Sequence, residues 1–308
     1  MLETYQKTIA KEVSFSGITL HKGRESKIRI LPGESDQGII FKRTDLKINN
    51  VIKAKYNNVS STKLCTTIRN KNGVEVSTIE HLLAALYIAE VDNVIIEINC
   101  DEVPIMDGSA KNFLEKLKSV GTKDLDKKRK YLKILSKLRI NDGEKEITIE
   151  PNDDTLKIDF ELKYDNKLIG NQKNVVDFKS NDLNDISESR TFCLSKDIEK
   201  IKSKGLAKGG SLDNAVVVDE DKILNKSGLR NKNEFVNHKI LDLLGDFYLA
   251  GCRIIGSVKC KQGGHQLTNT FLRHILSSKN NFKSISSEEF HIRLKVNPTQ
   301  TSKIAVNA

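Results

Sequence analysis

The sequence predicts an α+β fold built from two similar domains, each a sheet layered with helices. Segments in which apolar and polar residues alternate, as in half-buried strands, precede helical segments in both halves. Each half then runs helix, strand, loop, helix, and the spacing from His81 to Ser109 nearly equals that from His238 to His265. With 308 residues and 38% hydrophobic composition, the chain can also bury two cores.

The first domain, expected over residues 1–125, begins with strands and tight turns, because its alternating segments are interrupted by breakers such as Pro32-Gly33. Apolar residues then recur at helical spacing, and a short apolar run follows them. In order, the expected elements are strands at 13–18 and 27–31, a helix over 77–90, a strand over 93–98 and a helix opening at Ser109.

The second domain is expected over residues 126–308. Its boundary with the first domain falls within the charged segment 121–130, whose near lack of apolar residues is typical of a linker. A small βαβ-like unit is expected at about 193–219. In order, the expected elements are strands within 131–140, 146–150 and 156–162; a strand over 190–194, a helix over 195–203 and a strand over 214–218; and a helix over 234–250, a strand over 253–260 and a helix over 266–277.

The net charge of +10 is spread along the chain, with acidic residues and asparagines between the lysines. A lysine-rich solvated surface explains this pattern better than a nucleic-acid footprint, although an anionic small substrate also fits it. A basic RNA-binding α+β protein remains the alternative from another class. The absence of tryptophan and of any recognisable RNA-binding signature counts against it.

The apolar runs and the cysteines of the chain indicate its cellular location and the role of its thiols. No run approaches the ~20 apolar residues of a membrane span, and the N-terminal residues lack the apolar core of a signal peptide. We therefore expect a cytoplasmic protein without a stable membrane anchor. The five cysteines are far apart and contain no CxxC pair, so neither a disulfide framework nor a cysteine zinc cluster is expected.

Two short motifs are candidates for a metal site. Glu80 and His81 stand side by side at the start of an apolar helix, and His238 and Asp242 lie four residues apart on one face of another. In a duplicated fold, equivalent helices can face each other across the domain interface. Two nitrogens and one carboxylate would then converge, which is the ligand set of a hydrolytic zinc site. The same set also suits Fe²⁺.

Each motif alone has an ordinary structural explanation. Ser77-x-x-Glu80 matches a capping box, His81 can be a satisfied helix histidine, and His238 with Asp242 can be a surface pair. The prediction therefore rests on their conjunction. The helix that carries His238 and Asp242 is otherwise lined by apolar residues, and polar groups buried there would need partners such as a metal.

Other polar side chains near these motifs also have both a functional and a structural interpretation. His265 follows two glycines and precedes a helix, so it can project from a tight loop into a cleft. Lys239 lies beside the ligand face and can receive an anionic substrate, although an exposed lysine is the default for a helix. His21 is either a hydrogen-bonding residue or a distant contributor to the site, whereas His274 and His291 are expected to be structural.

Taken together, these motifs closely resemble those of the UDP-3-O-acyl-N-acetylglucosamine deacetylases, the zinc amidases of lipid A biosynthesis. The similarity covers nearly the whole chain in order, beginning with the segment GITLHKG at 17–23. The segments that carry it are STIEHLLAAL at 77–86, PIMDGSA at 104–110, RTF at 190–192, HKILDLLGD at 238–246 and GH at 264–265.

The resemblance implies a two-domain α+β fold with the active site between the domains. His81, His238 and Asp242 would hold Zn²⁺. Glu80 would be the general base and His265 the charged partner or general acid. Asp246 would support His265, Lys239 would support the substrate, Thr191 would lie near the oxyanion and Phe192 near the sugar.

In this family an insert encloses the acyl chain of the substrate, and the βαβ-like unit at about 193–219 would correspond to it. Apolar residues in the unit can line such a passage, although a plain small core explains the same residues. They are Ile198, Ile201, Leu206, Ala207, Leu212, Ala215 and Val217.

The implied activity is hydrolysis of the 2-acetamide of a UDP-linked, 3-O-acylated glucosamine, the committed step of lipid A biosynthesis. The small-molecule substrate is the one partner expected, with no nucleic acid, and the chain is expected to be a monomer. A zinc amidase acting on another acylated amino sugar is the alternative within enzymes. The loop at 164–170 is shortened relative to the family, which leaves the substrate contacts there open.

Overall fold

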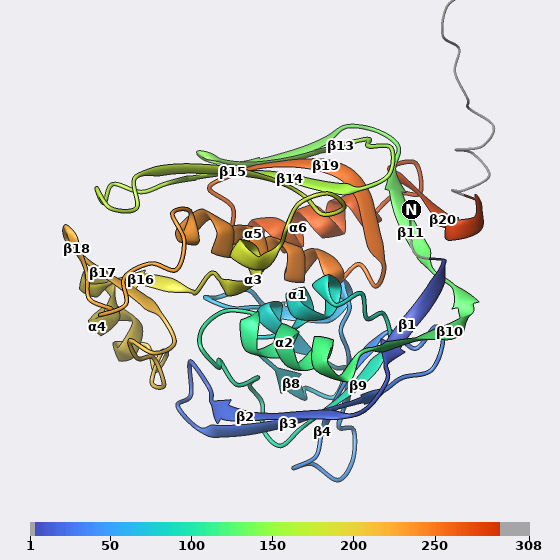
Figure 1. Cartoon of the computed structure of the whole chain (residues 1–308), viewed down its shortest axis with the longest axis horizontal. Helices are drawn as coiled ribbons and strands as arrows, with labels where there is room; N and C mark the ends of the chain where they lie inside the picture. The colour runs from blue at the N-terminus through green and yellow to red at the C-terminus, as the bar shows by residue number, and fades with distance from the viewer. Residues whose placement is uncertain (1–3, 290–308) are drawn as a thin grey trace, which may run out of the picture.

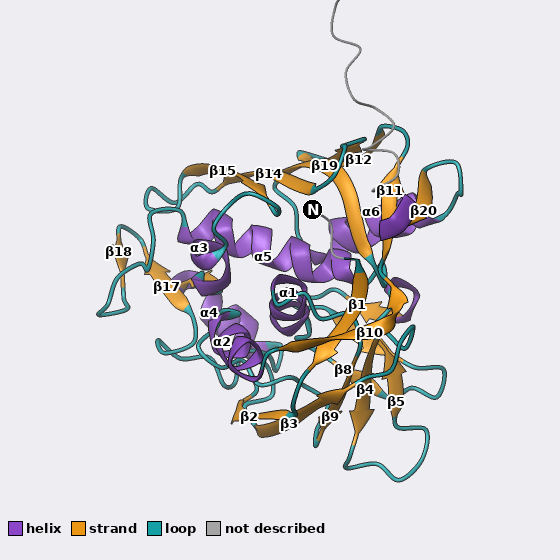
Figure 2. Cartoon of the chain, turned by 45° about the vertical axis from the view of Figure 1, so that its right-hand side comes forward, coloured by secondary structure: helices purple, strands orange, loops and turns teal. Residues whose placement is uncertain are grey.

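The computed structural model describes residues 4–289 of the chain. Two sheets form opposite faces of the molecule and the main helices lie between them (Figure 1). The same layers are visible after a turn of 45° in Figure 2. His291, expected from the sequence to be structural, lies outside the described residues.

The sheet of the first half has the strand order β2-β3-β9-β4-β5. Its neighbouring strands are antiparallel except for the parallel pair β9 and β4. Burial alternates along β3, as the sequence pattern predicts. The strands are β2 Val13–Ile18, β3 Glu25–Pro32, β4 Ile39–Arg43, β5 Val51–Lys53 and β9 Val94–Ile98.

The second half repeats this arrangement. Within its seven-stranded sheet, β12, β13, β19, β14 and β15 are neighbours in that order, and again only the third and fourth strands pair in parallel. The two halves therefore share one topology, which confirms the predicted duplication. The strands are β12 Leu138–Asp142, β13 Lys145–Glu150, β14 Leu156–Lys163, β15 Asn171–Asp177 and β19 Arg253–Lys261, with β11 Lys130–Ile134 and β20 Phe282–Ser286 completing the sheet.

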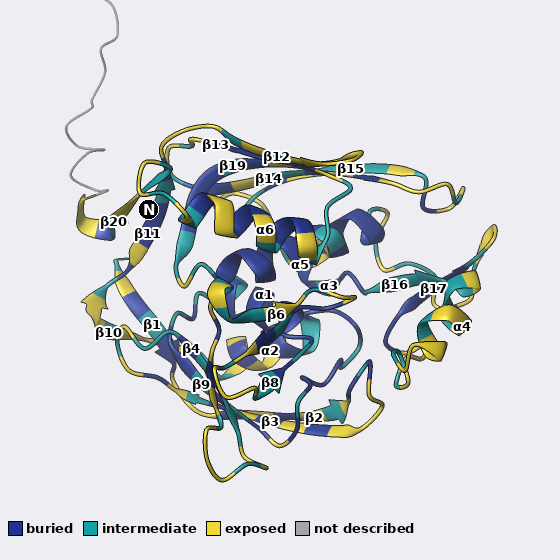
Figure 3. Ribbon diagram, turned by 180° about the vertical axis from the view of Figure 1, so that it is seen from behind, coloured by how far each residue is buried: buried dark blue, intermediate teal, exposed yellow. Residues whose placement is uncertain are grey.

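Equivalent helices of the two halves meet in the middle of the molecule. They are α1 Glu80–Ile88 and α2 Lys111–Val120 in the first half, and α5 Glu234–Tyr248 and α6 His265–Leu276 in the second. α1 and α5 are buried along almost their whole lengths, and they lie at the centre of Figure 3. A helix that is apolar on nearly all sides belongs in such a position.

The start of α1 differs from the prediction. The helix begins at Glu80 rather than Ser77, because Thr78 has a φ of 57°, which lies in the left-handed region and cannot continue a helix. The Ser77 hydroxyl donates a hydrogen bond to the carbonyl oxygen of Asp101. The Glu80 carboxylate is bound elsewhere, so the capping-box explanation for Glu80 is wrong.

The charged segment 121–130 is a strand rather than a linker loop. Its central part forms β10, Thr122–Lys128, which pairs antiparallel with β1, Tyr5–Ile9. A two-stranded ribbon is held by backbone hydrogen bonds and needs no apolar stripe. The pattern that identified the other strands was therefore missing here.

The predicted βαβ unit is present and projects from one end of the molecule (Figure 1). β16, Phe192–Leu194, pairs in parallel with β17, Val216–Asp219, and α4, Ser195–Ser203, connects them. The shorter elements of the described chain are β6 Val59–Ser61, β7 Thr67–Arg69, β8 Glu75–Val76, β18 Lys222–Ile223, α3 Asn184–Glu188 and a 3₁₀ turn at Tyr56–Asn58. Within residues 4–289, no helix is long and apolar enough to span a membrane.

Gly245 allows α1 and α5 to cross in close contact. A Cβ atom at this position would lie 2.1 Å from the backbone oxygen of Glu80. We expect Gly245→Ala to lower the free energy of unfolding by about 1–3 kcal/mol, as overpacking of a core does. Chemical denaturation measures the effect. Gly264→Ala is the matched control, since a Cβ there meets open space and its φ of −169° suits any residue.

Candidate active site

The α1–α5 crossing brings the two predicted ligand motifs together. Ligand atoms of His81, His238 and Asp242 all lie within 4.8 Å of one another, and all three residues are buried. Asp242 Oδ1 is 3.5 Å from His81 Nε2 and 3.4 Å from His238 Nε2. This oxygen is buried and has no hydrogen-bond partner. Two imidazoles and an unsatisfied carboxylate oxygen are the donor set that a divalent transition metal requires.

The ligand side chains are held in place by neighbouring groups. The Nδ1 atom of His238 is 3.0 Å from the carbonyl oxygen of Ser189, so Nδ1–H donates there and Nε2 keeps its lone pair toward the cluster. Asp242 Oδ2 accepts a hydrogen bond of 2.7 Å from Lys239 Nζ. The second oxygen of Asp242 is therefore occupied, and Oδ1 is left for a metal.

Burial and charge set the protonation states of the cluster. Burial lowers the pKa of His238 to about 3, although Asp242 partly opposes this effect. Burial would raise the pKa of Asp242, but His238 and Lys239 outweigh it and hold that pKa well below its usual range. A neutral imidazole and an ionised carboxylate are the forms that bind metal ions.

A second group of polar side chains adjoins the cluster. Glu80 Oε1 is 3.8 Å from His265 Nε2, and His265 Nδ1 is 2.8 Å from Asp246 Oδ2. Thr66, which precedes β7, contacts both acids. Its backbone N–H donates to Glu80 Oε2 at 3.0 Å, and its hydroxyl donates to Asp246 Oδ1 at 2.6 Å.

The pKa values of His265 and Glu80 are both raised, but for different reasons. Burial would lower the pKa of His265, but Asp246 and then Glu80 outweigh it and raise the pKa to about 10, so the imidazole is protonated at neutral pH. Burial raises the pKa of Glu80, although His265 and His81 oppose the shift. The pair offers one group that can give a proton and one that can take a proton within the same pocket.

Two adjoining cavities surround these side chains. One has a volume of about 450 Å³ and is lined by Glu80, by His265 and by the candidate metal-ligand cluster, which consists of His81, His238 and Asp242. The other has a volume of about 360 Å³, is mainly apolar, and lies against the βαβ unit. Both cavities are lined in part by Leu20, Leu64, Thr191 and Phe192.

The sequence-predicted residues divide between these cavities. Lys239 joins Thr191 and Phe192 in the wall of the polar cavity. The apolar cavity is lined by the predicted Ile198, Ile201, Ala207, Leu212, Ala215 and Val217. Leu206 is not among its lining residues. These residues therefore line a cavity, whereas the alternative left open by the sequence was that they fill a small core.

Several site residues were not predicted from the sequence. Nothing in the sequence indicated that Thr66 belongs to the site, because a threonine beside a short strand is common. Tyr164, from the loop at 164–170, lines the polar cavity, and its ring centroid lies 5.8 Å from that of Phe192. His21, by contrast, was considered from the sequence as either a hydrogen-bonding residue or a distant contributor to the site. It lines the apolar cavity, is buried, and has no hydrogen-bond partner on either ring nitrogen.

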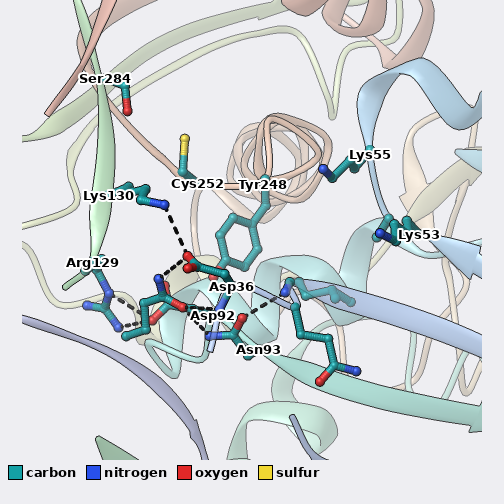
Figure 4. A pocket seen from close by; sticks show the side chains of 16 residues that line it. Asp36, Lys53, Lys55, Asp92, Asn93, Arg129, Lys130, Tyr248, Cys252 and Ser284 are labelled. Atoms are coloured by element: carbon teal, nitrogen blue, oxygen red, sulfur yellow. Dashed lines mark hydrogen bonds and ion pairs between the residues drawn. The ribbon is translucent and has the colours of Figure 1, made fainter. Parts of the chain in front are cut away.

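A further cavity, of about 270 Å³, lies at the opposite end of α5, where Tyr248 and Cys252 face the junction between the two halves (Figure 4). The buried Arg129 side chain forms an ion pair of 2.7 Å with Asp92 there. No residue proposed from the sequence as a site residue lines this cavity. Its polar groups join the two halves at a distance from the metal-ligand cluster.

Comparison with known proteins agrees with this geometry. The family model described as LpxC, UDP-3-O-acyl N-acetylglycosamine deacetylase, matches residues 6–277. A UDP-3-O-acyl-N-acetylglucosamine deacetylase from Geotalea uraniireducens is 44% identical over 274 residues, 89% of each chain. The proteins of the same description from Haemophilus ducreyi and Shewanella frigidimarina are 40% and 41% identical, each over 92% of this chain and 94% of their own. The chain therefore belongs to the UDP-3-O-acyl-N-acetylglucosamine deacetylase family, the deacetylases of lipid A biosynthesis.

Proposed function

We propose that the protein hydrolyses the 2-acetamide of UDP-3-O-acyl-N-acetylglucosamine, giving the free amine and acetate, with Zn²⁺ held by His81, His238 and Asp242. One observation carries the proposal. The metal-ligand cluster and the Glu80–His265 pair line one cavity, and that cavity adjoins an apolar one. A polar reaction site beside an apolar chamber suits a sugar amide that carries an acyl chain.

The residues of the cluster fit a metal ion. The unpartnered Asp242 Oδ1 faces two imidazole nitrogens, while His238 Nδ1 and Asp242 Oδ2 are held by Ser189 and Lys239. Held by these three residues, a zinc ion would supply Lewis-acid chemistry: it would polarise an amide carbonyl and lower the pKa of a water molecule toward about 7. Fe²⁺ is the alternative, because two histidines and one carboxylate also suit it.

The chain's own groups then carry the proton transfers. Glu80, beside the cluster, takes a proton from the attacking water. Thr191 lies in the wall where the carbonyl oxygen gains negative charge and stabilises that oxygen. Protonated His265, held by Asp246, gives a proton to the leaving nitrogen, which cannot depart as an amide anion.

The same cavities suggest where the rest of the substrate binds. The acyl chain enters the apolar cavity beneath the βαβ unit, and Phe192, which lines both cavities, packs against the sugar. Lys239 supplies a positive charge near the reaction site. We place the reaction in the cytoplasm, where nucleotide-linked sugars are made, and propose a monomer whose domains span 1–125 and 126–308.

A panel of substrates tests this assignment. We expect deacetylation of the UDP-linked, 3-O-acylated sugar with a kcat/KM at least about 100-fold above that of the same nucleotide sugar without the acyl chain, because burial of each CH₂ contributes about 0.8 kcal/mol. Comparable activity on an acylated amino sugar without the nucleotide would instead favour an amidase for another acylated sugar.

The apolar cavity yields a prediction about acyl length. We expect Ala215→Phe, which narrows the cavity, to reduce kcat/KM for the longest tolerated acyl chains by at least about 10-fold, as overpacking by 1–3 kcal/mol does. Activity on short-chain substrates should change much less. Val175→Phe is a control at an exposed position on β15. An equal loss for all chain lengths would contradict the placement of the acyl chain.

A further inference from the structure

Thr66 closes a ring of contacts that joins the two halves of the molecule. Each carboxylate in the ring uses one oxygen for Thr66 and the other for His265. Glu80 faces the Thr66 backbone N–H through Oε2 and His265 through Oε1. Asp246 faces the Thr66 hydroxyl through Oδ1 and His265 through Oδ2.

The members of the ring come from both halves of the fold. Thr66 and Glu80 belong to the first half, whereas Asp246 and His265 belong to α5 and α6 of the second. The hydroxyl of Thr66 is therefore a direct polar link between halves at the reaction site. Its side chain is well placed to hold this link, since the residue is only 1% exposed.

We propose that Thr66 is a positioning residue for the acid–base pair, a role that rests on the proposed function of Glu80 and His265. The Thr66 hydroxyl fixes the Asp246 carboxylate in the orientation that holds His265 Nδ1. The backbone N–H fixes Glu80 Oε2, which leaves Oε1 directed at His265. One residue thereby sets the spacing between proton acceptor and proton donor.

Loss of the Thr66 hydroxyl is expected to lower kcat rather than to weaken substrate binding. The residues that line the two substrate cavities do not include Thr66, so its removal leaves the walls that bind acyl chain and sugar unchanged. Without the hydroxyl, Asp246 Oδ1 loses a buried hydrogen bond and the carboxylate can turn. A shift of about 1 Å in a catalytic group can cost about 100-fold in rate.

Thr66→Val tests the proposal, since valine keeps the shape and removes the hydroxyl. We expect kcat to fall by at least about 10-fold, with KM and metal content within about twofold of the wild type. Thr66→Ser should restore most of kcat. Thr67→Val is the matched control, because that neighbouring hydroxyl lies 3.9 Å from Cys65 Sγ and reaches neither carboxylate.

A double-mutant cycle separates positioning from a general loss of structure. In the Asp246→Ala background, Thr66→Val should cause no further loss of kcat, because the hydroxyl acts through that carboxylate. Equal losses in both backgrounds, or a wild-type kcat for Thr66→Val, would overturn the proposal. If Asp246→Ala itself kept the wild-type kcat, the assignment of His265 as the supported acid would fail as well, which is a distinguishable outcome. Thr66→Ala repeats the test should the valine variant not fold.

Discussion

His238→Ala is expected to lose both bound metal and activity. The substitution removes one of three protein ligands, and the two that remain come from different helices. We expect stoichiometric metal in the purified wild type, little in the variant, and kcat lower by on the order of 1000-fold, because metal assistance is worth several kcal/mol. Elemental analysis and a deacetylation assay on the same samples measure the two quantities together.

The control for this experiment is another histidine. His274→Ala changes an exposed residue on α6 and should retain both metal and activity. Wild-type protein that is folded and active but binds no metal would falsify the assignment of the cluster. Metal retained by His238→Ala with wild-type affinity would exclude His238 as a ligand.

The repeated order of elements made the fold predictable. Helices with apolar faces, such as 195–203, were located to within a few residues, because helical periodicity depends only on local sequence. β10 was not predicted, because its local sequence carries no such pattern. Its burial follows neither an apolar stripe nor alternation, and its partner β1 lies more than 100 residues earlier in the chain.

The meeting of His81, His238 and Asp242 was predictable from the sequence, whereas the contacts of Thr66 were not. His238 and Asp242 are four residues apart on one helix, so spacing alone placed them on one face. Their meeting with His81 required the duplicated fold, which the order of elements suggested. Thr66 contacts Glu80 and Asp246 only because the chain just before β7 lies against the α1–α5 crossing. No short-range pattern encodes that contact.

Glu80→Gln and His265→Ala are each expected to lower kcat/KM by about 100- to 10,000-fold, the usual contribution of a positioned acid or base. Metal content should stay near that of the wild type in both variants, since neither side chain belongs to the metal-ligand cluster. A loss of less than about tenfold in either variant would contradict its role.

The pH dependence follows from the same two groups. Activity requires ionised Glu80, so it rises as pH increases through the Glu80 pKa, which burial raises. Activity also requires protonated His265, so it falls as pH increases through the His265 pKa of about 10. Asp246 is the main charge that raises the His265 pKa against burial. Asp246→Asn should therefore move the descending limb to lower pH and leave the ascending limb nearly in place. A descending limb that did not move would mean that another group supplies the proton.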